Sequence, residues 1–204
     1  NIEKEVTMNT IGKDVIVEQE ITKSSFITYL KKVTSVEEAK SYIKEIKELH
    51  PSATHHVTSY SVGPTGEHGH ANDDGEPSGT AGLPVLDVFK KNDVTNFVCI
   101  VVRYFGGIKL GAGGLVRAYS SSASLALKEA GIAPIINYSK VTLIFSYGYM
   151  NIIENKLRQY EIIEKDFTTN VMLTIKIPTQ EVDMLKQLLI SLTNNQIIIQ
   201  ENAI

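Results

Sequence analysis

The stretch FVCIVVRYFGGIKLGAGGLVRAY, residues 97–119, decides how the first part of this chain folds. Residues 97–104 form a nearly continuous apolar run, which is typical of a central strand covered on both faces. Five glycines follow within residues 106–114, and glycine at this density indicates backbone that turns tightly or approaches another group closely. Small residues dominate 113–130, so we predict a helix there that packs closely on a sheet and ends at Gly131.

A second polar stretch, DDGEPSGTAG at residues 73–82, contains three carboxylates, two hydroxyls and three glycines. It completes a long polar connection over residues 63–79, and loops of this length in compact domains are usually functional or disordered. Both polar stretches end where a helix is predicted to begin, here over residues 80–91. Because the first N–H groups of a helix lack helical partners, free donors gather at both places. The two stretches therefore point to a site.

Local patterns predict the other elements of the first part. Residues 15–17 and 25–30 have the composition of two strands, which we expect to form a hairpin. Ser35 and Glu38 form a capping box, in which the serine caps a helix and the glutamate reaches back. Apolar residues then recur at helical spacing, and residues 55–62 are predicted to form a short strand.

The pattern changes after Ala133 and Pro134, where we place a domain boundary near residues 133–138. Strands and helices then alternate as β-α-β-β-α-β, which is the ferredoxin-like arrangement. The predicted elements are strand 141–147, helix 153–160, strands 162–167 and 171–177, helix 182–192 and strand 197–199. The chain is therefore predicted to form two α+β domains, the second of which has few residues suited to chemistry.

The composition is that of an ordinary globular protein, with 43% hydrophobic and 21% charged residues among 204. No apolar run approaches the roughly 20 residues of a membrane span, and residues 1–10 lack the pattern of a signal peptide. Cys99 is the one cysteine and lies within the apolar run, so we interpret it as a buried hydrophobic residue. We expect a cytoplasmic protein that does not bind membranes.

The charge balance argues against strong nucleic-acid binding. The net charge is −3; residues 1–136 carry 14 Lys and Arg against 16 Asp and Glu, and residues 137–204 carry 6 against 7. A phosphate backbone is bound by clustered cations. We therefore expect no binding of DNA, and any affinity for RNA should be weak and sensitive to salt.

Two motifs allow alternative interpretations of the chemistry. Asp73, Asp74 and Glu76 could hold a divalent cation together with nearby histidines, but an Asp-Asp-Gly sequence is more often simply a turn. Adjacent side chains of a strand point to opposite faces, so at most one of His55 and His56 can face a given site. We predict no metal and no cofactor.

The glycine-rich stretch does not match a P-loop or a dinucleotide fingerprint. With Lys109, Arg117 and Arg103 nearby, a glycine-rich turn that enters a helix suits a phosphate or carboxylate group. Alternatively, the glycines only permit close packing of the helix on the sheet. No nucleophile motif of a catalytic triad is present around the available serines.

Taken together, DDGEPSGTAG and VVRYFGGIKLGAGGLVRAY resemble the IMPACT family, and in particular its bacterial branch typified by YigZ. The resemblance covers residues 15–130, and residues 137–204 are similar to the C-terminal domain of that branch, which is itself like domains of elongation factor G. It implies a fold like domain 2 of ribosomal protein S5, with a left-handed βαβ arrangement, for residues 1–134, and a ferredoxin-like fold for residues 137–204.

The resemblance also implies a role in translation, because eukaryotic members restrain a stress-activated kinase of translation initiation by competing for its activator. Our leading hypothesis is a non-enzymatic binding protein that regulates translation or a stress response. Its partner would be a protein or RNA component of the translation machinery, with a small anion as a further ligand. The alternative is a hydrolase-like enzyme that handles a small molecule or phosphate in a cleft of the first domain.

The candidate binding residues combine the family motif with the local chemistry. We expect five of them to converge in one cleft, namely Asp74, Glu76, Thr80, Arg103 and Arg117. The full set is His56, Asp73, Asp74, Glu76, Thr80, Arg103, Gly107, Lys109, Gly113, Gly114 and Arg117. No catalytic residue is assigned.

Overall fold

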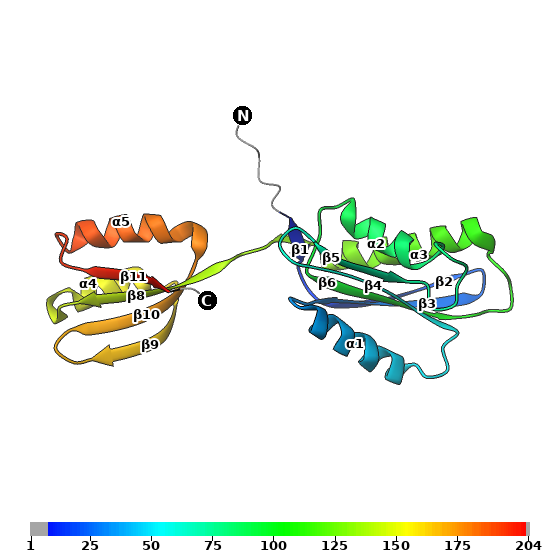
Figure 1. Ribbon diagram of the computed structural model, residues 1–204, viewed down its shortest axis with the longest axis horizontal. Helices are drawn as coiled ribbons and strands as arrows, with labels where there is room; N and C mark the ends of the chain where they lie inside the picture. Colours follow the sequence, from blue (N-terminus) through cyan, green and yellow to red (C-terminus); the bar gives the residue numbers. More distant parts are fainter. Residues whose placement is uncertain (1–7, 203–204) are drawn as a thin grey trace, which may run out of the picture. The chain divides into compact units, whose positions relative to one another are not determined.

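The computed structural model describes residues 8–202, and the chain divides into two compact units between Ile135 and Ile136 (Figure 1). Most of the segment considered above for a signal peptide therefore lies outside the described residues. None of the helices within 8–202 combines the length and the apolar character needed to cross a membrane.

The first unit is built on a five-stranded sheet in which every pair of neighbours is antiparallel. The predicted hairpin forms its first two strands, and the apolar run lies in the middle, as expected. The strands in spatial order are β2 (Val15–Ile21), β3 (Ser24–Lys32), β6 (Phe97–Tyr104), β4 (His55–Val62) and β5 (His68–Asn72).

Helices cover both faces of this sheet (Figure 1). α1 (Val36–Leu49) lies on one face, while α2 (Gly82–Lys90) and α3 (Gly111–Ala130) lie on the other. Alternate residues of β6 supply two separate cores: Cys99 and Val101 pack on the α2 and α3 side, and Val98, Ile100 and Val102 on the α1 side. This confirms the prediction of a central strand. Complete burial raises the pKa of the Cys99 thiol.

The helix ends follow the predicted signals with small differences. The Ser35 hydroxyl accepts the Glu38 N–H at 3.1 Å, but the Glu38 carboxylate reaches the N–H of Thr34 rather than that of Ser35. α3 begins at Gly111, two residues earlier than predicted. Its end leads into β7 (Ile132–Pro134), which pairs antiparallel with β1 (Asn9–Ile11).

The prediction of a loop over residues 63–79 is wrong in part, because these residues include a strand. β5 (His68–Asn72) pairs with β4 at the edge of the sheet, opposite Thr58 to Val62. Its sequence, HGHAN, lacks the apolar alternation that marks a half-buried strand, because an edge strand with exposed residues can satisfy its hydrogen bonds without contributing to a core.

The second unit has the six main elements in the predicted order. Its sheet is antiparallel with the strand order β11-β8-β10-β9, and both helices contribute to a core around Leu143 and Leu173. The elements are β8 (Tyr138–Phe145), η1 (Tyr147–Tyr149), α4 (Met150–Leu157), β9 (Glu161–Phe167), β10 (Val171–Pro178), η2 (Thr179–Glu181), α5 (Val182–Leu192) and β11 (Ile198–Asn202).

Candidate functional site

Asp73 holds the start of α2 in place. Its carboxylate accepts hydrogen bonds from the backbone N–H groups of Gly79 at 2.8 Å, Ala81 at 3.2 Å and Gly82 at 2.8 Å. Burial alone would raise the pKa of this carboxyl, but the three donors outweigh burial and lower it below its ordinary value. The donors that the sequence places at this helix start are therefore used by a side chain of the same loop.

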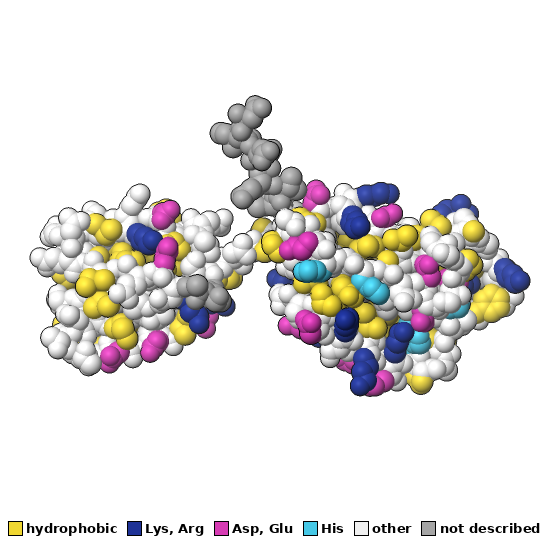
Figure 2. Space-filling view, in the orientation of Figure 1, with side chains coloured by type: hydrophobic (Ala, Val, Ile, Leu, Met, Phe, Trp, Pro, Cys, Tyr) yellow, Lys and Arg dark blue, Asp and Glu magenta, His cyan; other side chains and the backbone are white. Residues whose placement is uncertain are grey.

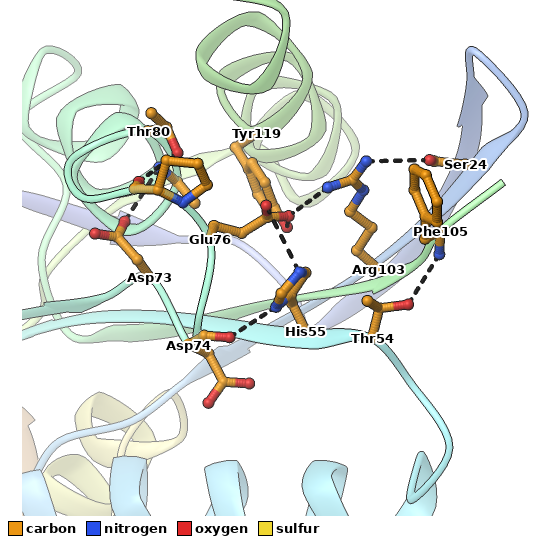
Figure 3. Close-up of polar contacts among 12 residues, drawn as sticks. Ser24, Thr54, His55, Asp73, Asp74, Glu76, Thr80, Arg103, Phe105 and Tyr119 are labelled. Carbon is orange, nitrogen blue, oxygen red and sulfur yellow. Dashed lines mark hydrogen bonds and ion pairs between the residues drawn. The ribbon is translucent and has the colours of Figure 1, made fainter. Parts of the chain in front are cut away.

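Glu76 lies in a buried polar cluster beneath α3 (Figure 3). Arg103 Nη1 donates to Glu76 Oε1 at 2.7 Å, and Tyr119 Oη donates to the same oxygen at 2.6 Å. The side chains of Glu76 and Arg103 are only 3% and 6% exposed. Burial, and then the hydrogen bond to Glu76, raises the pKa of Tyr119. The buried charge of Glu76 is therefore balanced by Arg103 and stabilised by the Tyr119 hydroxyl.

Arg103 connects this cluster to the start of the glycine-rich connection. Its Nη2 donates to the Ser24 hydroxyl at 3.3 Å, and that hydroxyl also accepts the N–H of Gly106 at 3.2 Å. The guanidinium carbon lies 5.6 Å from the centre of the Phe26 ring and 5.5 Å from that of Phe105. Its buried Nε has no hydrogen-bond partner within the described chain.

Asp74 binds the first two residues of β4, one through its backbone carbonyl and the other through its carboxylate. His55 Nδ1 donates to its backbone carbonyl at 2.8 Å, and its carboxylate accepts the backbone N–H of His56 at 2.7 Å. Lys47 lies 3.3 Å from the same carboxylate. Burial would raise the pKa of Asp74, but the His56 N–H and Lys47 outweigh it and lower the pKa.

The two adjacent histidines point in different directions, as strand geometry requires. His55 is the one beside the buried cluster, with Nε2 3.7 Å from Glu76 Oε2. The predicted candidate, His56, instead donates from Nε2 to the carbonyl of His50 at 2.8 Å. Alternation alone could not tell which of the two faces the cluster, since either register places one of them there.

A second polar cluster, which the sequence did not predict, lies at the end of α1. His50 follows α1 directly, and its ring nitrogens form hydrogen bonds with Tyr29 Oη at 2.6 Å and Tyr104 Oη at 2.8 Å. Burial, and then the proximity of His56, lowers the pKa of His50. The only sequence signal was a histidine between a helix and a proline, which does not identify partners on distant strands.

Glycine is required for different physical reasons at different positions of the connection between β6 and α3. A Cβ on Gly106 would overlap the Lys23 carbonyl oxygen, so this glycine permits close packing. Gly107 and Gly111 have φ of +86° and +71° and open space around a notional Cβ, so backbone conformation favours glycine there. At Gly113, a notional Cβ would lie 3.7 Å from Arg117 Nη1. Close packing therefore accounts for Gly106, and backbone conformation accounts for Gly107 and Gly111.

The five residues expected to converge do not form one open cleft. Glu76 and Arg103 meet, but as a buried pair. The Thr80 hydroxyl donates to the Pro77 carbonyl at 2.6 Å within its own turn. Arg117 is exposed on α3. Asp74 contacts Lys47 of α1 and the start of β4 rather than the other four.

The connection before α3 is the exposed part of the motif. Lys109 and Arg117 are exposed and make no ion pair within the described residues. Gly114 is half-buried, and no side chain caps the start of α3 at Leu110. Within residues 8–202, no three His, Cys, Asp or Glu side chains lie close enough together to hold a metal ion.

Comparison with known proteins shows which family carries these motifs. The family model of the Impact N-terminal domain matches residues 22–127, which include both polar stretches, and that of a domain of unknown function, DUF1949, matches residues 143–196. The Bacillus subtilis protein named IMPACT family member YvyE is 38% identical over 200 residues, covering 97% of this chain and 91% of the relative. The chain belongs to the IMPACT family.

Two further relatives extend the likeness over most of the chain. IMPACT family member YigZ of Escherichia coli is 37% identical over 172 residues, covering 82% of this chain and 84% of the relative. A solved structure described as a hypothetical protein shares 34% identity with a TM-score of 0.65 and covers 97% of both chains. The likeness to these two proteins therefore covers residues of both units.

Proposed function

We propose that this IMPACT family member is a non-enzymatic binding protein that regulates translation or a stress response through a protein partner. The observation that carries the proposal is that the three carboxylates of the family motif, and Arg103, bind other side chains of the protein or the backbone. Ionisable groups that bind one another or the backbone stabilise the fold and are not available to a substrate. The motif therefore supports a binding surface rather than catalysis.

An enzyme would need at least one of these groups to be available. A general base must reach the proton that it removes and should have a pKa near the working pH. Asp73 and Asp74 accept backbone N–H groups and have lowered pKa values, which disfavours that role. The Glu76 carboxylate is occupied by Arg103 and Tyr119. These contacts favour the binding protein over the hydrolase-like alternative.

The surface next to the scaffold supports partner binding. Phe105 and Ile108 are 46% and 43% exposed. Lys109, next to Ile108 in the sequence, and Arg117 of α3 are exposed as well. Large apolar side chains that protrude among charges are typical of protein contacts. The small number of cations favours a protein partner over RNA. Gly107, Gly113, Gly114 and Lys109 would then shape the binding surface, together with Arg117.

The finer fold assignments belong to the same proposal. We propose an S5 domain 2-like fold for residues 1–134 and a ferredoxin-like fold, related to domains of elongation factor G, for residues 137–204. The sheet order β11-β8-β10-β9 with its β-α-β-β-α-β sequence supports the second assignment. Kinship to translation components is an analogy at the level of the fold. A cytoplasmic location fits this role.

A bacterial cell-free translation reaction tests the proposal. We expect purified wild-type protein to change the rate of reporter synthesis in a dose-dependent way. The double variant Phe105→Ala, Ile108→Ala should lose this effect because it removes the protruding apolar groups. Leu49→Ala, which truncates an exposed leucine at the end of α1, is the matched control and should retain it.

Two results would contradict the proposal. One is the absence of any effect of the wild-type protein on reporter synthesis over the whole concentration range. The other is turnover of a phosphate ester or nucleotide that disappears in Asp74→Asn, since this would show that a motif carboxylate performs chemistry.

A further inference from the structure

We propose that the basic tip of the first unit docks an acidic segment of a partner protein that carries apolar residues. The basic tip consists of Lys23, Phe105, Ile108, Lys109 and Arg117. The inference rests on the proposed function and deepens it by naming the chemistry of the partner.

The tip is formed by two connections that are distant in sequence, together with Arg117 near the beginning of α3. Lys23 lies in the turn between β2 and β3, and Phe105, Ile108 and Lys109 lie between β6 and α3. Figure 1 shows both connections at the same end of the sheet. Backbone contacts agree with this arrangement, because Ser25 is paired with Tyr104 and Gly106 packs against the Lys23 carbonyl.

The apolar part of the tip is held in a fixed position. The Phe105 N–H donates to the Thr54 hydroxyl at 3.0 Å, and the Gly106 N–H donates to the Ser24 hydroxyl at 3.2 Å. The Phe105 ring lies over the buried Arg103 guanidinium. An exposed aromatic side chain that is already ordered loses little entropy on binding, and such anchors carry much of the affinity of protein interfaces. The buried cluster thus supports the tip.

The charged side chains of the tip are all basic. The sequence contains no Asp or Glu between Asp93 and Glu129, although the first 136 residues carry more acids than bases. Lys23, Lys109 and Arg117 are exposed, and none forms an ion pair within the described residues. Figure 2 shows Lys or Arg side chains together with hydrophobic ones at this end of the unit.

The nearest acids along the neighbouring strand do not cancel this charge. Glu18 and Glu20 of β2 alternate with Gln19, and Gln19 donates to Ser121 and Ser122 of α3. Because successive side chains of a strand point to opposite faces, the two glutamates face away from α3. The buried Glu76 is already paired with Arg103.

This combination fits an acidic apolar peptide better than RNA. Three exposed cations can neutralise few phosphates at once, so the gain from counterion release would be small. Ile108 has no flat face on which a base could stack, whereas it can contact an apolar side chain of a peptide. Complementary charge would bring the acidic segment to the tip, and Phe105 would anchor it.

Fluorescence anisotropy with a fluorescein-labelled peptide of alternating Glu with Leu and Phe tests the inference. We expect saturable binding that weakens as salt is raised. Lys109→Glu with Arg117→Glu should raise the Kd by about tenfold or more, because it reverses two of the three charges. Phe105→Ala should raise it by about fivefold or more. The control Lys40→Glu with Lys44→Glu reverses two exposed charges on α1 and should stay within about twofold.

Three results would overturn the inference. The first is equal binding of a peptide in which every Glu is replaced by Gln. The second is tighter binding of a single-stranded oligouridine of equal length. The third is an equal loss in the control variant on α1. Circular dichroism and thermal unfolding should show that each variant has kept the wild-type fold.

The failure of this inference is distinct from the failure of the proposed function. If the acidic peptide does not bind but the protein still alters translation in a Phe105-dependent way, only the inference is wrong. If the peptide binds at the tip but translation is unaffected at every concentration, the inference holds and the proposed function is wrong.

Discussion

The two glycine-rich polar stretches of the first unit look alike in sequence but behave oppositely in the fold. Residues 73–82 turn inward, so that Asp73 and Glu76 are engaged by the backbone and by Arg103. The connection over residues 105–110 turns outward and leaves Phe105 and Lys109 exposed. A high density of charged groups therefore does not identify a functional surface. What matters is whether the partners of those groups lie within the same chain.

The largest effect should come from Glu76→Ala, which breaks the inward-facing stretch. The variant leaves Arg103 buried without its counter-ion, and removing one partner of a buried ion pair costs about 3–5 kcal/mol. Urea unfolding measures the loss, with Glu45→Ala on the exposed side of α1 as the control. A loss of less than about 1 kcal/mol would mean that the stretch is not a scaffold.

Asp73→Ala should have a smaller effect on the same stretch. Three backbone N–H groups before and at the start of α2 lose their acceptor. Those of the buried residues Ala81 and Gly82 are costly to leave without a partner, so we expect a loss of about 1–3 kcal/mol. Asp87→Ala, an exposed position on α2, is the matched control for urea unfolding. Equal losses in both variants would contradict a specific role of Asp73.

The inward-facing groups also predict how stability depends on pH. The pKa of His50 is lowered from 6.5, so the unfolded chain binds the proton more tightly and stability falls as pH drops below 6.5 towards the folded value. His50→Gln should reduce this fall between about pH 7.5 and about pH 5.5. Part of it should remain, because the pKa of His70 is lowered too. An unchanged slope in the variant would contradict the assignment to His50.

A further loss of stability is expected in acid. Since the pKa values of Asp73 and Asp74 are lowered from 3.8, their contribution is complete above that value and is lost as pH falls through their folded values. Urea unfolding of Asp73→Asn, followed as pH falls below 3.8, should show a shallower decline than the wild type. An identical decline would show that Asp73 does not contribute.

The smallest effect on stability should come from the outward-facing stretch. Arg117→Ala removes an exposed side chain and should change the free energy of unfolding by no more than about 0.5 kcal/mol. It should still weaken binding of inorganic phosphate, for which we expect a Kd on the order of millimolar, measured by NMR titration. Unaltered phosphate binding in the variant would exclude Arg117 from the anion-binding surface, whereas a large loss of stability would make it structural.

The sequence predicted the elements whose signals are local and periodic. The apolar run in β6, the capping serine of α1 and the alternating strands of the second unit are examples, because burial imposes their patterns on neighbouring residues. β5 was missed because an exposed edge strand needs no such pattern.

The candidate site was harder to predict because its contacts join distant residues. The sequence distinguished Glu76 and Arg103 as motif residues, but 27 positions separate them, and nothing local indicates that Tyr119 completes their cluster. Nor could it decide that His55, rather than His56, would lie beside Glu76. Such details depend on how the sheet packs under α3.

A double-mutant cycle on the buried pair tests most directly whether the motif is an internal scaffold. The free energies of unfolding are measured for the wild type, Glu76→Gln, Arg103→Met and the double variant. We expect the double variant to be more stable than the sum of the single losses implies, with a coupling of about 2 kcal/mol or more. Additive losses, within about 0.3 kcal/mol, would contradict this and would make Glu76 and Arg103 available for a ligand.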